Sequence, residues 1–150
     1  MKRLFLDANV LFTAAHNPGG KAALILELAG AGHWEALTST YAVAEARRNL
    51  ERKAPQRAPA LRELLRNVRV VAATKGAGCL LPLPEKDRPI FASALEAGAT
   101  HLLTGDIKDF GPFMNDAEQT AGVLIQTAGE FLASLIPHDL LTTSAKPPTS

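Results

Sequence analysis

Acidic residues that directly follow apolar stretches are the residues of this 150-residue chain best suited to chemistry. In "RLFLDANVLF", Asp7 ends a short apolar run. In "HLLTGDIKDFG", Asp106 and Asp109 come just after a run that stops at Thr104. Asp and Gly are also common in turns, so each carboxylate has a purely structural alternative. A shared site requires a fold that brings these segments together.

Two further acidic residues stand near the starts of predicted helices. Asp87 opens the helical stretch in "LPEKDRPIFASALEAGA", and Glu45 lies in the first or second turn of "TYAVAEARRNLERK". Each again has an alternative role. Asp87 could be only an N-cap residue, and Glu45 could pair with Arg48 or Asn49 on the helix surface.

Strand-length apolar runs alternate with helical stretches along the chain. We predict strands near residues 4–6, 34–40, 68–73, 101–104 and 122–127. We predict helices over 19–32, 40–53 (capped by Ser39 or Thr40), 54–67 (broken at Pro55 and restarting near Pro59), 83–99 and 128–135. This alternation predicts an α/β fold, a single three-layer α/β/α domain around a mostly parallel five-stranded sheet.

Such a sheet would gather the acidic residues at one edge. Ligands of open parallel sheets bind outside the carboxyl ends of the strands, where Asp7 and Asp106 would lie. Helices that run antiparallel to the strands begin at that same edge, which adds Asp87 and Glu45. We therefore expect four carboxylates from distant segments to converge, with Asp109 beside them.

Convergence of carboxylates is energetically costly. Two carboxylates ~5 Å apart repel by roughly 3 kcal/mol at an effective dielectric constant of ~20. Four of them would consume much of the ~5–15 kcal/mol by which a domain is stable. If no basic side chain lies among them, the site implies raised pKa values or a bound cation. Oxygen ligands favour Mg²⁺ or Mn²⁺, ions that commonly assist phosphodiester hydrolysis.

The basic residues are unevenly distributed although the net charge is only +1. The segment 47–69 holds eight of the 16 Lys and Arg residues and only two acidic ones, Glu51 and Glu63. Such an excess can attract a polyanion, and it is equally well explained as the solvated faces of two surface helices. The predicted nucleic-acid contacts are Arg47, Arg48, Arg52, Lys53 and Arg57.

Taken together, these motifs resemble the PIN-domain family of metal-dependent nucleases over roughly residues 2–135. "LFLDANVLF" is similar to the opening of the family, an apolar strand that ends in Asp with Ser, Thr or Asn two residues later. "YAVAEARRNL" is similar to the segment that carries the Glu of the family. "KDRPIFASALEAGATHLLTGDIKDF" is similar to its most diagnostic stretch, in which an Asp opens a small-residue helix that leads to strand-Thr-x-Asp.

The resemblance implies a metal-dependent endoribonuclease that hydrolyses phosphodiester bonds with Mg²⁺ or Mn²⁺. It assigns catalysis to Asp7, Glu45, Asp87 and Asp106, and metal binding to the same four residues and Asp109. It implies that Asn9 and Thr104 orient carboxylates or contact phosphate. Asp109 follows Asp106 by three residues, whereas many members of the family have a spacing of two.

Partners also follow from the resemblance. Many small bacterial members are VapC-type toxins, so it implies an RNA substrate, a cognate antitoxin protein of a type II toxin–antitoxin pair, and a homodimer. The alternative is a catalytically inactive PIN-like module that binds RNA or protein. The residues do not separate a toxin from an RNA-processing enzyme.

Length and composition predict one domain over residues 1–136 and a disordered tail over 137–150. The single cysteine, Cys79, excludes an internal disulfide and a Cys-based zinc cluster. The amino-terminal apolar stretch is interrupted by Asp7 before it reaches the length of a signal peptide. No run reaches the ~18 apolar residues of a membrane span, and we expect a cytoplasmic protein.

Overall fold

A computed structural model describes residues 1–77 and 79–136, so the predicted tail over 137–150 lies outside the described residues. Five strands form one sheet in the order β3-β2-β1-β4-β5, and every pairing between them is parallel. The strands are β1 (Arg3–Leu6), β2 (Glu35–Ser39), β3 (Arg69–Val71), β4 (His101–Leu103) and β5 (Leu124–Gln126). The predicted α/β fold with a five-stranded parallel sheet is confirmed.

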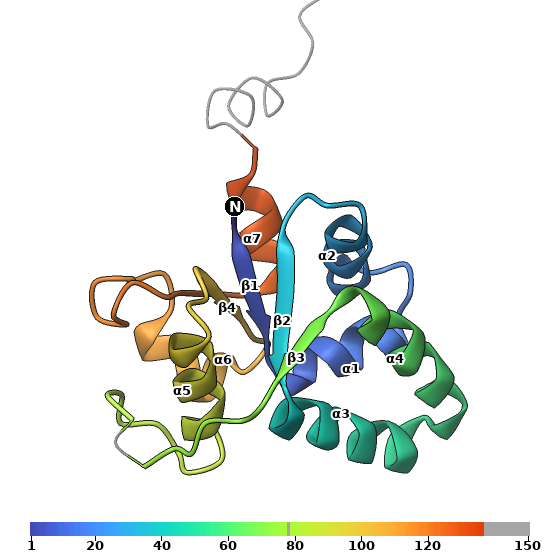
Figure 1. Ribbon diagram of the computed structural model, residues 1–150, viewed down its shortest axis with the longest axis horizontal. Helices are drawn as coiled ribbons and strands as arrows, with labels where there is room; N and C mark the ends of the chain where they lie inside the picture. The colour runs from blue at the N-terminus through green and yellow to red at the C-terminus, as the bar shows by residue number, and fades with distance from the viewer. Residues whose placement is uncertain (78, 137–150) are drawn as a thin grey trace, which may run out of the picture.

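Helices cover both faces of the sheet. They are α1 (Ala8–His16), α2 (Lys21–Gly30), α3 (Thr40–Lys53), α4 (Ala58–Leu64), α5 (Arg88–Glu96), α6 (Ile107–Phe110) and α7 (Ala128–Ser134). Three 3-10 turns join them, Pro55–Arg57, Leu65–Asn67 and Gly111–Phe113. In Figure 1, α1 and α4 lie on one side of the sheet and α5 and α6 on the other. None of the described helices is long and apolar enough to cross a membrane.

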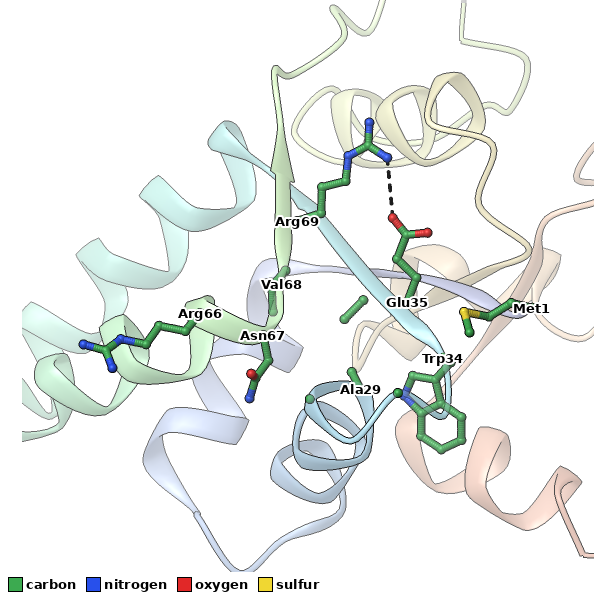
Figure 2. Close-up of a pocket in the computed structure, with 11 residues that line it drawn as sticks. Met1, Ala29, Trp34, Glu35, Arg66, Asn67, Val68 and Arg69 are labelled. Carbon is green, nitrogen blue, oxygen red and sulfur yellow. Dashed lines mark hydrogen bonds and ion pairs between the residues drawn. The ribbon is translucent and has the colours of Figure 1, made fainter.

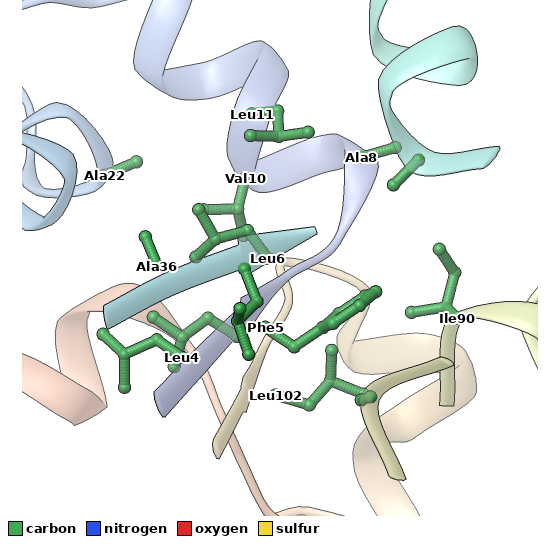
Figure 3. Packing of buried hydrophobic residues seen from close by; sticks show 14 of the residues in the cluster. Leu4, Phe5, Leu6, Ala8, Val10, Leu11, Ala22, Ala36, Ile90 and Leu102 are labelled. Carbon is green, nitrogen blue, oxygen red and sulfur yellow. The ribbon is translucent and has the colours of Figure 1, made fainter. Parts of the chain in front are cut away.

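The central strand β1 is covered on both faces. Leu4, Phe5 and Leu6 are fully buried, although their side chains alternate between the two faces of the sheet. Ile90 of α5 and Leu102 of β4 are among the buried residues drawn with them in Figure 3. Burial of successive residues is what a near-continuous apolar run predicts for a strand between two helical layers.

The helix boundaries follow from local caps and turns. Ser39 caps α3, since its hydroxyl accepts a hydrogen bond from the Ala42 amide at 3.2 Å. Helix α5 begins at Arg88, five residues later than predicted, because the preceding segment forms turns such as Asp87 N–H to Pro84 O at 2.9 Å. Gly98, with φ +71°, follows α5 in the left-handed conformation that glycine adopts most easily.

The strand order reverses between β1 and β4. From β1 the chain continues through β2 to β3 on one side, and β4 and β5 fill the other side. Adjacent strands whose connections lead in opposite directions leave a crevice at their carboxyl ends, where α/β proteins bind ligands. Asp7 and Thr104 directly follow these two strands, and the Asp7 amide donates to Leu103 O at 3.0 Å.

Candidate active site

Asp7 is buried at the carboxyl end of β1, where it also caps α1. Its Oδ1 accepts a hydrogen bond from the Ala8 amide at 2.7 Å. Its Oδ2 accepts from the Thr104 hydroxyl at 2.7 Å and from Asn9 Nδ2 at 3.2 Å. The carboxyl group is therefore held in one orientation by groups from both central strands and α1.

Burial raises the pKa of Asp7 to about 6. The hydrogen bonds from Thr104 and the Ala8 amide oppose this shift, whereas the charges of Glu45 and Asp106 add to it. A carboxyl group in this state would be stabilised in its ionised form by an added cation.

Asn9 and Thr104 connect Asp7 to the loop after β4. The Thr104 hydroxyl accepts a hydrogen bond from the Asp106 amide at 3.0 Å while it donates to Asp7. Asn9 Oδ1 accepts from the Gly105 amide at 2.7 Å. Both side chains thus lie where they can orient the carboxylates, the role that the resemblance implies for them.

Asp87, Asp106 and Asp109 form a compact group of carboxylates. One oxygen from each lies within 4.8 Å of the others. Helix α6 explains the spacing of three between Asp106 and Asp109, because residues i and i+3 lie on the same side of a helical turn. Asp106 also caps α6, accepting a hydrogen bond from the Asp109 amide at 3.0 Å, so a capping role and a place in the site coincide.

A basic side chain lies within this group, so the condition that no basic residue lies among the carboxylates is not met. The Lys86 ammonium is 3.8 Å from Asp87 Oδ2, 3.6 Å from Asp106 Oδ2 and 3.4 Å from Asp109 Oδ2. One ammonium shared by three carboxylates leaves the group with a formal charge of −2 when all are ionised. Asp7 has no such partner among residues 1–77 and 79–136.

The buried Asp87 provides the test of whether a cation fits. Its side chain makes no capping hydrogen bond at the start of α5, and its Oδ2 is buried without a hydrogen-bond partner. Burial raises the pKa of Asp87 to about 7, with Lys86 opposing the shift and the charges of Asp106 and Asp7 adding to it. A buried oxygen without a partner, next to two further carboxylates, suits a hard divalent cation.

The pKa of Asp109 is shifted in the opposite direction from that of Asp87. Desolvation would raise the pKa of Asp109, but its contacts with Lys86, Asp87 and Asp106 outweigh that effect and lower it. These contacts therefore favour the charged form of Asp109.

Glu45 lies outside the three-carboxylate group. It is half-buried on α3, and its charge raises the pKa of both Asp7 and Tyr41. Tyr41 precedes Glu45 by four residues, so both lie on the same side of α3. The Tyr41 hydroxyl donates to Lys86 O at 2.9 Å, which ties α3 to the segment that carries Asp87.

The predicted nucleic-acid contacts fall into two sets. Arg47, Arg48 and Arg52 are exposed on α3. By contrast, Arg57 Nε donates to Ala15 O at 2.9 Å at the end of α1, and Lys53, although also exposed, has its ammonium 5.7 Å from the centre of the Phe12 ring. The last two side chains therefore support the packing of α1.

Two hollows flank the sheet at opposite ends. One of about 600 Å³ adjoins the carboxylates and is lined by Asn9, Thr104, Gly105 and Lys21, among others. Another, of about 620 Å³, lies near the starts of β2 and β3 (Figure 2). There Glu35 is paired with Arg3 at 3.4 Å and Arg69 at 3.5 Å, so that end of the sheet has no excess of acidic charge.

Sequence reasoning did not single out Lys86 or Tyr41. Lys86 stands next to Asp87 in "EKDRP", but a lysine beside an acidic residue usually points to solvent. The spacing of four between Tyr41 and Glu45 is the only signal in the sequence that Tyr41 faces the site.

The comparisons with known proteins identify the family. A sequence profile of the PIN domain family matches residues 3–108, so the chain belongs to this family, as the motifs indicated. A search of curated proteins by sequence finds no match.

Solved structures share the fold at low sequence identity. VapBC2 from Rickettsia felis, bound to a fragment of promoter DNA, has a chain with a TM-score of 0.61 and 17% identity, covering 83% of this chain and 98% of that one. A chain of DNA-bound VapBC from Salmonella typhimurium has a TM-score of 0.60 and 19% sequence identity, and the match covers 85% of this chain and 99% of that one. VapC20 from Mycobacterium tuberculosis, a toxin that cleaves the sarcin-ricin loop, has a TM-score of 0.52 and 18% sequence identity. The match covers 69% of this chain and 91% of that one.

Proposed function

We propose that this protein is a divalent-metal-dependent endoribonuclease that uses Mg²⁺ or Mn²⁺ to hydrolyse phosphodiester bonds. The observation that carries the proposal is the group of carboxylate oxygens from Asp87, Asp106 and Asp109, within 4.8 Å of one another, beside the buried Asp7. Membership of the PIN domain family supports the same activity. The neighbouring structures support the fold on which the site is built.

Asp7, Asp87 and Asp106 would hold the cation, with Asp109 and Glu45 adding negative charge and further oxygen atoms. When bound, such an ion acidifies water for attack on phosphorus and neutralises charge on the phosphate oxygens. Thr104 and Asn9 keep Asp7 in place through the hydrogen bonds described above. This preorganisation matters because the carboxylate need not reorient as the reaction proceeds.

The substrate would lie across the edge of the sheet that carries the carboxylates. The exposed arginines of α3, Arg47, Arg48 and Arg52, can attract the phosphate backbone of RNA. Arg48 is close enough to the site for its charge to act on the Tyr41 hydroxyl. Away from α3, the hollow beside Thr104 and Gly105 has Lys21 as its charged lining residue and offers room for a neighbouring nucleotide.

The direct test is cleavage of a single-stranded RNA by purified wild-type protein and the Asp7→Asn variant in the presence of Mn²⁺. We expect the variant to lose activity by on the order of 100-fold or more, because it loses a charge on which the site depends. The amide keeps one acceptor oxygen but presents an N–H donor where Asp7 Oδ2 accepts from Thr104 and Asn9, so we expect some loss of stability as well. Thermal melting of both proteins checks that the fold is retained.

The matched control is Glu118→Gln, which removes an exposed carboxylate from the loop before β5. This variant should cleave RNA like wild type. Undiminished cleavage by a folded Asp7→Asn variant would remove Asp7 from the mechanism. RNA binding without metal-dependent cleavage by wild type would instead support the inactive module, a reading that the neutralising contacts of Lys86 favour.

We further propose that the nuclease is the toxin of a type II toxin–antitoxin pair and forms a homodimer. The likeness of fold to chains of VapBC complexes from three bacteria supports the toxin role, and the homodimer follows from the resemblance to small bacterial members of the family. Induced expression of wild type should arrest growth of a bacterial host, and Asp7→Asn should not. Rescue of growth by the protein encoded next to this gene would identify the antitoxin, and unimpaired growth with active enzyme would contradict the toxin role.

A further inference from the structure

We propose that Lys86 is a built-in counter-ion of the carboxylate group, which a divalent cation must displace before the site is filled. Lys86 would then set the concentration of metal at which the enzyme becomes loaded. The inference rests on the proposed function, because that function supplies the metal site. The new element is that a side chain of the protein itself, the Lys86 ammonium, competes with the metal ion for the carboxylates.

The contacts of the ammonium support this role. Lys86 Nζ lies 3.4–3.8 Å from one oxygen of each carboxylate in the group, Asp87, Asp106 and Asp109. The same three residues contribute the oxygens that lie within 4.8 Å of one another. A single positive charge is therefore shared by the atoms best placed to hold a metal ion, and a dication there would repel it.

The backbone of Lys86 is held in place while its side chain can move. The Tyr41 hydroxyl binds Lys86 O at 2.9 Å, and the turn continues through Asp87 N–H to Pro84 O at 2.9 Å. Arg88 Nε adds a bond to Leu83 O at 2.8 Å. The side chain of Lys86 is 60% exposed, whereas that of Asp87 is only 8% exposed. Rotation of the lysine stem can therefore carry the ammonium into solvent without disturbing the carboxylates.

The competition has a clear energetic basis. In the metal-free protein the ammonium reduces repulsion among the three carboxylates, and this stabilisation is lost when a dication takes its place. That loss makes the binding of a metal ion less favourable, so the metal binds more weakly than it would without the lysine. Removing the ammonium should therefore tighten metal binding and weaken the metal-free fold, two opposite effects of one substitution.

The experiment compares Lys86→Met with Lys108→Met, each in the full chain. Both substitutions remove one ammonium and keep an unbranched stem. Lys108 is exposed on α6 between Asp106 and Asp109, and it makes no ion pair within the described part of the chain. Calorimetric titration with Mn²⁺ at about pH 8, after treatment with a chelator, measures the dissociation constant of each variant and of wild type.

We expect Lys86→Met to bind Mn²⁺ roughly tenfold more tightly than wild type. A roughly tenfold change is a typical size for the effect of one bound group, here the ammonium, on the affinity for another, here the metal ion. Lys108→Met should change the affinity by less than about twofold, since no ion pair joins Lys108 to the three carboxylates in the described part of the chain. In the presence of chelator, Lys86→Met should melt at a lower temperature than Lys108→Met.

Mn²⁺ affinity in Lys86→Met equal to that of Lys108→Met, or weaker than wild type, would overturn the inference and leave the proposed function standing. Absence of Mn²⁺ binding by wild type and both variants would contradict the proposed function and the inference together. A melting temperature of chelator-treated Lys86→Met at or above that of Lys108→Met would contradict the neutralising role of the lysine.

Discussion

At the scale of single residues, Asp7 and Asp87 are two buried acids in different surroundings. Asp7 has hydrogen bonds to both oxygens, whereas Asp87 Oδ2 has none. Burial is the largest cause of the raised pKa at both positions. Both therefore resist ionisation in the metal-free protein, and a cation would reverse that preference.

The pKa values of these acids predict a pH dependence of metal binding. The folded values, about 6 for Asp7 and about 7 for Asp87, lie above the ordinary value of 3.8. The stability that these groups contribute is thus full below about pH 4 and is lost as the pH rises through 6 and then 7. A metal ion binds the ionised forms and releases protons, so its affinity should rise over the same window.

Calorimetric titration with Mn²⁺ from about pH 5.5 to about pH 8 measures this dependence. We expect the affinity of wild type to rise by at least about tenfold across the range. The Asp7→Asn variant should show a shallower rise, because the group that titrates near 6 is missing. A flat profile for wild type would contradict the linkage between protonation and metal binding.

The acidic residues were predictable from the sequence, but the surroundings of each were not. Asp7 and Asp106 follow apolar runs, and the parallel topology alone places them at one edge. Lys86 enters the group by the direction of its side chain, which depends on a turn held by Tyr41 on another helix. The contact between Tyr41 and Lys86 cannot be predicted from the spacing of residues in the sequence.

At the scale of elements, α3 presents basic side chains next to the candidate site. Its first turn lies near the carboxylates, since the charges of Glu45 and Asp87 both act on Tyr41. Arg48 follows less than two turns later and is exposed. We therefore expect its guanidinium to contact an RNA phosphate.

We predict that Arg48→Gln weakens binding of a single-stranded RNA several-fold and reduces the magnitude of the negative slope of log affinity against log salt by about 1. Binding is measured by fluorescence anisotropy in EDTA, so that cleavage does not interfere. Lys2→Gln is the control, because Lys2 is an exposed cation just before β1, at the opposite end of the sheet. Equal losses in the two variants would show that α3 has no special part in RNA binding.

Most elements were predicted from the sequence, and the exceptions have physical reasons. Helix α1 was not predicted, because "LDANVLFTAAH" continues the apolar run of β1 without a glycine or proline between them. The structure separates the two at Asp7, whose side chain caps the helix. Helix α6 is a single turn, too short for a periodic pattern, yet it brings Asp109 beside Asp106.

At the scale of the whole molecule, the strand order explains why distant acids meet. Asp7 and Thr104 follow adjacent strands at the point where the order reverses, and Asp106 lies two residues beyond. Asp87 directly precedes α5, which lies on the opposite side of the sheet from α1 (Figure 1). The opposite end of the sheet has its acid, Glu35, paired with two arginines. The fold thus gathers three carboxylates that share one ammonium, together with the buried Asp7, at one edge of the sheet.

The proposed activity requires that this edge of the sheet bind a divalent cation. The most direct measurement is the anomalous diffraction of crystals soaked in Mn²⁺. We predict a strong anomalous peak in direct contact with the carboxylates of Asp87 and Asp106, with the Lys86 ammonium turned away from them. A structure in which Mn²⁺ is absent from these carboxylates, while Lys86 keeps all three contacts, would contradict the account.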